Sequence, residues 1–114
     1  MKLPKKLISK AIQKYFGYSI DPCSLLVIEL TSDCNCACPI CAPAHVRKQI
    51  QRGYMSRDIF DKIVRQASKL KPKHVCVYAR GESLLHKDAV SMIRDLSENG
   101  FYTELVTNGE LITP

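Results

Sequence analysis

The order of hydrophobic and polar positions along the chain predicts three short strands. LLVIEL, at residues 25–30, is a nearly continuous apolar run rich in branched side chains. Such a run is typical of a strand covered on both faces, as in a parallel sheet. Two similar runs, HVCVYA at residues 74–79 and YTELV at residues 102–106, predict the second and third strands. The three runs therefore outline a small sheet.

Segments with apolar side chains at helical spacing separate these strands. The first, residues 57–70, has Ser56 in position to cap it, and Pro72 ends it. The second spans about residues 87–98, with Gly100 as its C-terminal stop. The order strand, helix, strand, helix, strand predicts an α/β fold of parallel βα units with right-handed crossovers.

The connection between the first two strands carries an insertion. It is about 20 residues longer than the connection between the second and third strands, and the excess holds a cluster of cysteines. Three strands are too few to close a barrel, and a three-stranded parallel sheet leaves its edges bare. We therefore expect either that the sheet belongs to a larger α/β protein or that something else completes it.

The first 22 residues are predicted to form a leader apart from the core of residues 23–114. Within residues 1–16, apolar side chains recur every four positions among lysines, which predicts an amphipathic basic helix, and a linker follows it. The lysines are Lys2, Lys5, Lys6, Lys10 and Lys14, and the apolar stripe is Leu3, Leu7, Ala11 and Tyr15. We expect a solvated cationic face with the stripe packed on the core. Contact of residues 1–16 with an anionic membrane surface is the less favoured alternative, and no nucleic-acid partner is expected.

Composition places the chain among single globular units. Of its 114 residues 46% are hydrophobic and 25% are charged, and no apolar run approaches the 18 or so residues that cross a bilayer. The first twenty residues lack the pattern of a secretory signal. Without an export signal, six cysteines are read as reduced thiols or metal ligands, and a cytoplasmic location is expected.

Four of the cysteines lie within TSDCNCACPICAP, residues 31–43. Thiolates are soft ligands that suit zinc, copper(I) and iron–sulfur clusters. Taking Cys34, Cys38 and Cys41 as ligands leaves one coordination position vacant on a four-iron cluster, where a substrate or cofactor can bind. Cys36 is expected to point away from its neighbours at 34 and 38 as a small buried residue. The alternative makes Cys36 a fourth ligand, which would close the cluster.

The CxxxCxxC spacing of Cys34, Cys38 and Cys41 after the first strand resembles the radical S-adenosylmethionine (radical SAM) superfamily. The lead-in IELTSDCN is similar to that family's approach to its first cysteine. ARGESLLH, residues 79–86, resembles the family's Gly-Gly-Glu-Pro-Leu-Leu turn, and VTNG, residues 106–109, resembles its Thr-Asn-Gly. In the second motif Gly81 and Glu82 match, whereas Arg80 stands where the first glycine is usual and Ser83 replaces the proline. The resemblance covers roughly residues 25–112.

This resemblance implies a fold, two cofactors and a reaction. The fold is part of a TIM-type βα barrel. Three cysteines would hold a 4Fe-4S cluster that reductively cleaves S-adenosylmethionine (SAM) to a 5′-deoxyadenosyl radical, which abstracts hydrogen from a substrate still unidentified. Gly81 and Glu82 would receive the amino group of SAM, Ile40 would lie near its adenine, and Asn108 would contribute to cofactor binding. An electron donor such as a flavodoxin or ferredoxin is implied, and the 114 residues alone are expected to be inactive.

The positions of the three motifs support a common site without any appeal to family. Each motif lies just past the carboxyl end of a predicted strand, where ligands gather in parallel βα architectures. A non-catalytic zinc or iron–sulfur module is the alternative, with His45 as a further candidate ligand. His74 and His86 are expected to be solvated or capping residues, and Cys76 to be a small hydrophobe on its strand.

Overall fold

The computed structural model of the chain describes residues 5–16, 24–41, 44–49 and 51–113. Cys23 and the linker after the first helix lie outside these ranges. The elements in chain order are α1 (Lys5–Phe16), β1 (Leu25–Ile28), α2 (Ala44–Gln49), α3 (Arg57–Leu70), β2 (His74–Val77), a short 3-10 helix η1 (Ser83–Leu85), α4 (Ala89–Glu98) and β3 (Thr103–Leu105).

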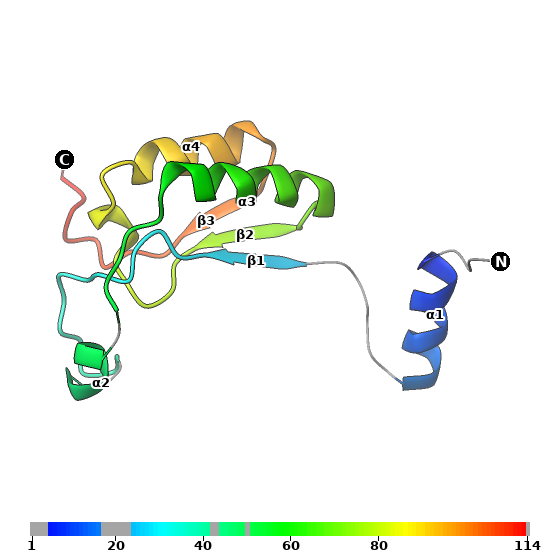
Figure 1. Cartoon of the computed structure of the whole chain (residues 1–114), viewed down its shortest axis with the longest axis horizontal. Coiled ribbons are helices and arrows are strands. Elements are labelled where there is room, and N and C mark those ends of the chain that lie inside the picture. The colour runs from blue at the N-terminus through cyan, green and yellow to red at the C-terminus, as the bar shows by residue number, and fades with distance from the viewer. Residues whose placement is uncertain (1–4, 17–23, 42–43, 50, 114) are drawn as a thin grey trace.

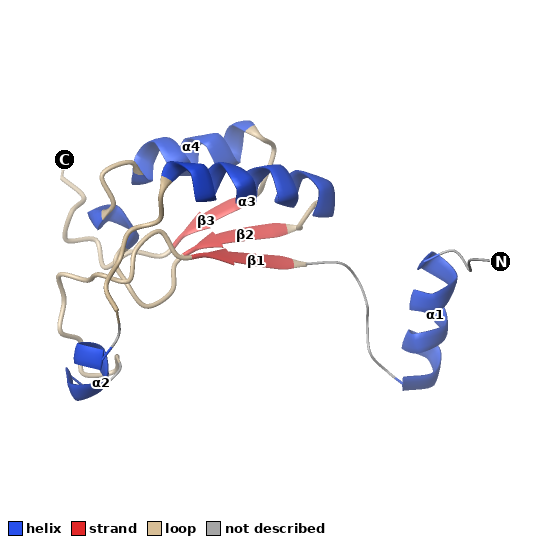
Figure 2. Ribbon diagram, in the orientation of Figure 1, coloured by secondary structure: helices blue, strands red, loops and turns tan. Residues whose placement is uncertain are grey.

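The three strands form one parallel sheet in the order β1-β2-β3. Helices α3 and α4 lie side by side on the same face of this sheet (Figures 1 and 2). The predicted succession of parallel βα units is therefore confirmed. The bounds of α3 agree with the prediction, whereas the three strands are shorter than their apolar runs and α4 begins at Ala89. Helix α2 and the 3-10 helix η1 were not predicted from the sequence.

Capping groups fix both ends of α3. The Ser56 hydroxyl accepts the backbone N–H of Ile59 at 3.4 Å, as expected of an N-cap. At the other end Lys71 adopts a left-handed conformation with φ of 52° and donates its N–H to Ala67. This turn reverses the chain just before Pro72, which cannot continue a helix. Both ends of α3 thus follow from local sequence.

The core lies between the sheet and the two helices. Its fully buried side chains are Ile28, Leu30, Phe60, Val75, Val77, Ala89, Met92 and Leu96. Side chains of β1 alternate, so that Ile28 is buried while Leu25 and Val27 are 48% and 43% exposed. The expectation that the first strand is covered on both faces is wrong for the described residues, because α3 and α4 occupy the same face. The opposite side, here called the uncovered face, carries Leu25, Val27, His74, Cys76 and Glu104.

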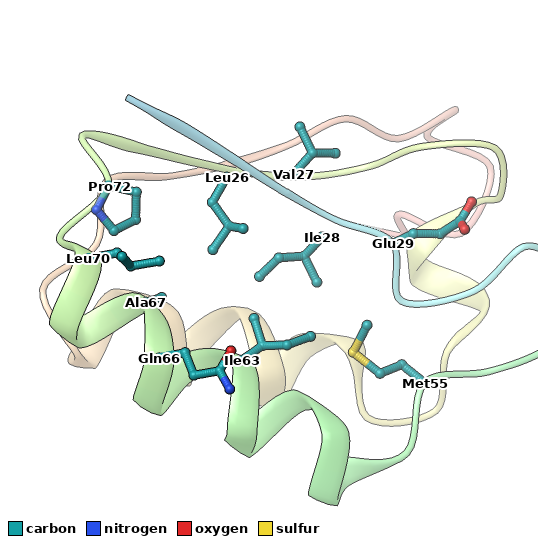
Figure 3. Close-up of a pocket in the computed structure, with 10 residues that line it drawn as sticks. All are labelled: Leu26, Val27, Ile28, Glu29, Met55, Ile63, Gln66, Ala67, Leu70 and Pro72. Carbon is teal, nitrogen blue, oxygen red and sulfur yellow. The ribbon is translucent and has the colours of Figure 1, made fainter. Parts of the chain in front are cut away.

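The outer edge of β1 has no partner strand among the described residues, as a three-stranded sheet requires. A groove of about 400 Å³ runs along this edge between β1 and α3 (Figure 3). Its apolar lining includes Leu26, Ile28, Ile63, Ala67 and Leu70. The predicted bare edge of the sheet is therefore confirmed in the part of the chain that the structure covers.

His86 joins the beginning of α3 to the beginning of α4. It is 5% exposed, and its Nδ1 accepts the backbone N–H of Asp88, the N-cap residue of α4, at 3.1 Å. The other ring nitrogen, Nε2, therefore carries the proton and donates to the carbonyl of Met55 at 2.8 Å. Of the two roles expected for this histidine, the structure shows capping and excludes solvation.

Helix α1 lies apart from the sheet and its two covering helices (Figure 1). Leu7, Ile8 and Tyr15 on its apolar side are 58%, 44% and 76% exposed. The expectation that this stripe packs on the core is therefore wrong for the described residues of the helix. No helix in the described ranges is both long and apolar enough to cross a membrane.

Candidate metal and cofactor site

The cysteine segment leaves the carboxyl end of β1 as a loop whose four cysteines are exposed or half-buried. Cys34 and Cys36 are half-buried, and Cys38 and Cys41 are exposed. A tight turn closes the second half of the loop, where the backbone N–H of Cys41 donates to the carbonyl of Cys38 at 3.1 Å. Exposed thiols on a compact loop suit soft metal ions and iron–sulfur clusters rather than core packing.

The beginning of this loop is fastened to the returning chain at residues 51–55. Thr31 forms an isolated antiparallel bridge with Tyr54, and its hydroxyl donates to the carbonyl of Gly53 at 2.9 Å. The Asp33 carboxylate binds Arg52 at 2.7 Å and accepts the Tyr54 hydroxyl at 3.2 Å. The same carboxylate accepts the N–H of Cys34 at 3.0 Å. The insertion therefore leaves and re-enters the fold at one place, which fixes the position of the first predicted ligand.

The loop after β2 sits directly on the cysteine loop. The backbone N–H of Glu82 donates to the carbonyl of Asp33 at 2.8 Å. A Cβ atom on Gly81 would lie 2.2 Å from the carbonyl oxygen of Thr31 and 2.5 Å from that of Asp33. Only glycine allows this approach of two backbones. The glycine that matches the family motif is thus required by the fold at this point.

The carboxylate of Glu82 links the loop after β2 to the loop after β3. It is 3% exposed, and its Oε1 accepts the Leu84 N–H and the Thr107 hydroxyl, both at 2.9 Å. Its Oε2 accepts the backbone N–H of Asn108 at 2.7 Å. All three donors are uncharged. The cost of burying the carboxylate is therefore offset by hydrogen bonds to the charged oxygens and not by an ion pair. Its predicted contact with the SAM amino group stays a prediction, and the structure adds a role in loop placement.

Asn108 connects the loop after β3 to the cysteine loop. Its side-chain Nδ2 donates to Asn35 Oδ1 at 2.8 Å and to Cys36 Sγ at 3.2 Å. Its Oδ1 accepts the N–H of Glu110 at 3.0 Å, which shapes the turn around Gly109. The three motif stretches, expected to meet at one rim of the sheet, are therefore in direct contact.

Cys36 lies among the other thiols of the loop. Its backbone N–H is 3.5 Å from Cys34 Sγ, and its side chain is half-buried. Desolvation, followed by the neighbouring Cys38 and Cys34 thiols, raises the pKa of Cys36 above its usual value. The expectation of a buried side chain pointing away from its neighbours is wrong in this structure.

Ile40 and Arg80 lie at the outer side of the site. Ile40 is 95% exposed at the tip of the cysteine loop, so its contact with adenine stays a prediction. Arg80 binds Glu29 through its backbone N–H at 2.9 Å and through Nε and Nη2 at 3.1 and 2.7 Å. The side-chain hydrogen bond from Arg80 lowers the pKa of Glu29, against the opposing effect of burial. The pair with Arg80 was not predicted from the sequence. The signal that could have indicated it is the single charged residue, Glu29, within the apolar run LLVIEL.

The amino-acid sequence matches a known family and several curated proteins. The sequence model of the radical SAM superfamily matches residues 28–114. The tungsten-containing aldehyde ferredoxin oxidoreductase cofactor-modifying protein of Pyrococcus furiosus is 34% identical over 90 residues, which cover 77% of this chain and 24% of that protein. The PqqA peptide cyclase of Rhodopseudomonas palustris is 28% identical over 107 residues, covering 92% of this chain and 26% of that protein. The chain thus spans about a quarter of the length of these relatives.

A solved structure gives the same arrangement of elements. The crystal structure of BtrN in complex with AdoMet and 2-DOIA matches with a TM-score of 0.68 and 23% sequence identity. The match covers 80% of this chain and 38% of that one. The expected fold class, three parallel strands and two helices as part of a TIM-like barrel, is confirmed by this likeness.

Replacing Gly81 by alanine should destabilise the fold. The new methyl group would meet backbone atoms that cannot rotate away, so we expect the free energy of unfolding to fall by roughly 1–3 kcal/mol. Urea denaturation followed by circular dichroism measures the change. Gly53→Ala is the matched control, because a Cβ there has nothing within 4 Å. Equal effects of the two substitutions would show that the backbone contact at Gly81 has no energetic importance.

Glu82→Gln should also destabilise the fold. The amide NH₂ group of glutamine would face one of the three groups that now donate to the carboxylate, and that group would lose its acceptor. We therefore expect the free energy of unfolding, measured by urea denaturation, to fall by about 1–3 kcal/mol. Glu110→Gln removes the same charge at an exposed position of the neighbouring loop and should change little. A loss in the control as large as in Glu82→Gln would contradict the role assigned to this buried carboxylate.

Glu29→Gln should lower stability at neutral pH but not in acid. Because the folded-state pKa of Glu29 is lowered, its contribution is present above the unfolded pKa, about 4, and is lost as the pH falls through the folded pKa. Urea midpoints of the two proteins should therefore differ at pH 7 and converge at acid pH. Added salt should shrink the difference at pH 7, since Arg80 is largely exposed. A difference that grows on acidification would refute this assignment.

Proposed function

Because the chain belongs to the radical SAM superfamily, we propose that the loops at the carboxyl ends of its strands bind a 4Fe-4S cluster and SAM. The observation that carries the proposal is the contact of all three motif loops. Glu82 donates through its backbone to Asp33 and accepts Asn108 through its carboxylate, and Asn108 reaches Asn35. These bonds join the beginning of the cysteine loop, on either side of Cys34, to the glycine turn and to the Thr-Asn-Gly turn.

Cys34, Cys38 and Cys41 are the proposed ligands of the cluster. They offer three thiolates from one loop, and two of the three side chains are exposed, which leaves room for an inorganic core larger than a single ion. Three protein ligands leave one iron of a four-iron cluster open to SAM. When bound, the cluster and SAM supply one-electron chemistry that abstracts a hydrogen atom from a substrate.

Residues of the other two loops are proposed to place SAM at that cluster. Gly81 and Glu82 present backbone groups and a carboxylate beside the cysteine loop, where they can receive the amino group of SAM. Asn108, held by Glu82, is proposed to fix the nearby wall of the site. Ile40 has an apolar side chain open to solvent, and burying it against adenine would remove that surface from water.

The remaining parts of the proposal concern partners and the active unit. A one-electron donor such as a flavodoxin or ferredoxin is the expected partner, and the location is expected to be cytoplasmic, where thiols stay reduced. The names of the two relatives point to different substrates, so the proposal is limited to the reaction class. We expect the 114 residues to be inactive alone, because a three-stranded sheet with an uncovered face cannot enclose a substrate.

Anaerobic reconstitution with iron and sulfide tests the proposal. The chain should take up about four irons, and the electron paramagnetic resonance spectrum of the reduced cluster should change when SAM is added. Cys34→Ala, Cys38→Ala and Cys41→Ala should each lose the cluster. Cys36→Ala, in the same loop, is the matched control and should keep it.

Three results would contradict this proposal or a part of it. Stoichiometric zinc binding without uptake of iron and sulfide would favour the structural metal module. A reduced cluster whose spectrum ignores SAM would refute cofactor binding while leaving the iron–sulfur centre in place. Loss of the cluster in Cys36→Ala, with retention in the other three variants, would reverse the choice of ligands.

A further inference from the structure

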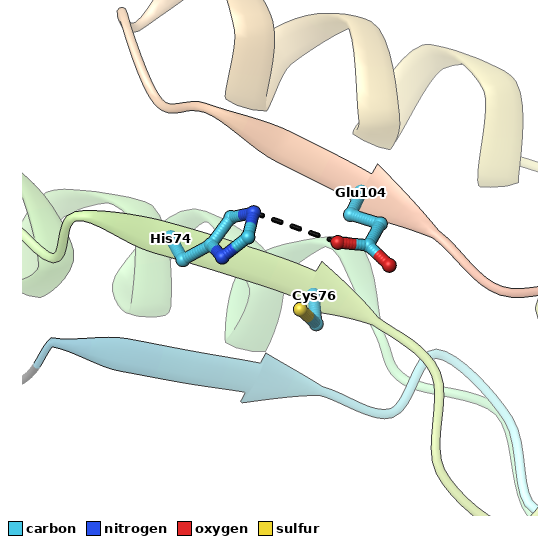
Figure 4. A group of neighbouring side chains, drawn as sticks. All are labelled: His74, Cys76 and Glu104. Carbon is cyan, nitrogen blue, oxygen red and sulfur yellow. Dashed lines mark ion pairs between the residues drawn. The ribbon is translucent and has the colours of Figure 1, made fainter.

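A second group of metal-ligating side chains lies on the uncovered face, away from the cysteine loop. His74 begins β2, Cys76 follows two residues later, and Glu104 lies on β3 in register with Cys76. Residues two apart on a strand, and residues paired across parallel strands, point to the same side of a sheet. Figure 4 shows the imidazole, the thiol and the carboxylate gathered over the strands β2 and β3.

The distances in this group are short enough for a single ion. One ligand atom from each residue lies within 4.8 Å of the other two, and His74 Nε2 is 3.5 Å from Glu104 Oε2. Zinc–nitrogen and zinc–oxygen bonds of about 2.0–2.1 Å at a tetrahedral angle place the two ligand atoms about 3.3 Å apart. The observed 3.5 Å between the histidine nitrogen and the glutamate oxygen is close to that value, and the Cys76 sulfur lies within 4.8 Å of a ligand atom from each of these two residues.

The hydrogen bonding of His74 supports a ligand role over an ordinary ion pair. Its Nε2 atom is buried and has no hydrogen-bond partner among the described residues, although Glu104 is close. The ring of Tyr102 packs against the imidazole, with centroids 4.6 Å apart at an interplanar angle of 47°. This contact holds the ring in place, and the unsatisfied nitrogen remains directed toward the carboxylate (Figure 4). Buried polar atoms without partners are rare and need an explanation.

We propose that His74, Cys76 and Glu104 form a binding site for a divalent, borderline-soft cation, with Zn²⁺ as the best fit. Nitrogen, sulfur and oxygen are the three ligand types that zinc accepts, and three protein ligands leave a fourth position for water or another group. Cys76 is 8% exposed, so its thiol has little contact with water. Its sulfur lies within 4.8 Å of the ligand atoms of His74 and Glu104. His74 and Cys76 were expected to be ordinary residues, because neither forms a motif with its neighbours along the chain. The proposal does not rest on the function proposed for the cysteine loop.

Cobalt(II) binding tests the site, because a cobalt–thiolate bond gives a charge-transfer absorption band. The other five cysteines are first replaced by serine in the full chain, so that Cys76 is the sole thiol. One equivalent of Co²⁺ should produce the band, and Zn²⁺ should displace it. Cys76→Ser should abolish the band, and His74→Ala or Glu104→Gln should raise the dissociation constant by more than about tenfold. Glu98→Gln, at an exposed carboxylate on α4, is the matched control and should leave binding unchanged.

A second measurement keeps the test decisive if the five-serine protein does not fold. In the unmodified chain, native mass spectrometry should count one zinc fewer for Cys76→Ser than for the parent protein. Absence of the cobalt band in a folded protein, or an unchanged zinc count, would overturn the proposal. A band that survives both His74→Ala and Glu104→Gln would show adventitious binding to a lone thiol and would overturn it equally.

Discussion

The site depends on a buried negative charge that no cation neutralises within the described hydrogen bonds. Glu82 is tolerated in the interior because three neutral donors from two loops converge on its carboxylate. Those donors belong to η1 and to the turn after β3, so the carboxylate determines how the two loops sit relative to one another. The backbone of the same residue reaches Asp33, which extends this control to the cysteine loop. One side chain and its own peptide group therefore organise the rim of the sheet.

The sheet explains why the loops can meet there. Parallel strands joined by helices on one face bring all their carboxyl ends to the same edge, and β1, β2 and β3 are neighbours in that order. Gly81 then allows two of the loops to touch at backbone distance. Because both helices lie on one face of the sheet, side chains on the uncovered face such as Leu25 and Val27 remain in contact with water. The fold thus holds the three motif loops together, while one face of the sheet has no covering element among the described residues.

Local signals in the sequence predicted what local interactions determine. Ser56 and Pro72 fixed α3 correctly, and the apolar runs located every strand. An apolar run does not reveal which faces are covered, so the exposure of β1 was missed. Short elements such as α2 and η1 show too little periodicity to be recognised. The pairs Arg80–Glu29 and His74–Glu104 join residues far apart in the chain, and only the strand register brings them together.

The position of Cys36 was missed for a related reason. The spacing of cysteines along a loop suggests which side chains point to the same side. The conformation of this loop, however, depends on contacts with Arg52, Tyr54 and Asn108, which lie outside the cysteine motif. The three-cysteine pattern gave the candidate ligands, and the surrounding loops gave their placement.

The bond between Asn108 and Asn35 has a consequence for biosynthesis. These residues are 73 positions apart. The ribosome therefore completes β1, the cysteine loop, β2 and both covering helices before it makes Asn108, whose amide joins the loop after β3 to the cysteine loop. Domains fold as their chains emerge, and the sheet can begin to form early. The cysteine loop can therefore gain its contact with Asn108 only after β3 and the turn that follows it have been made.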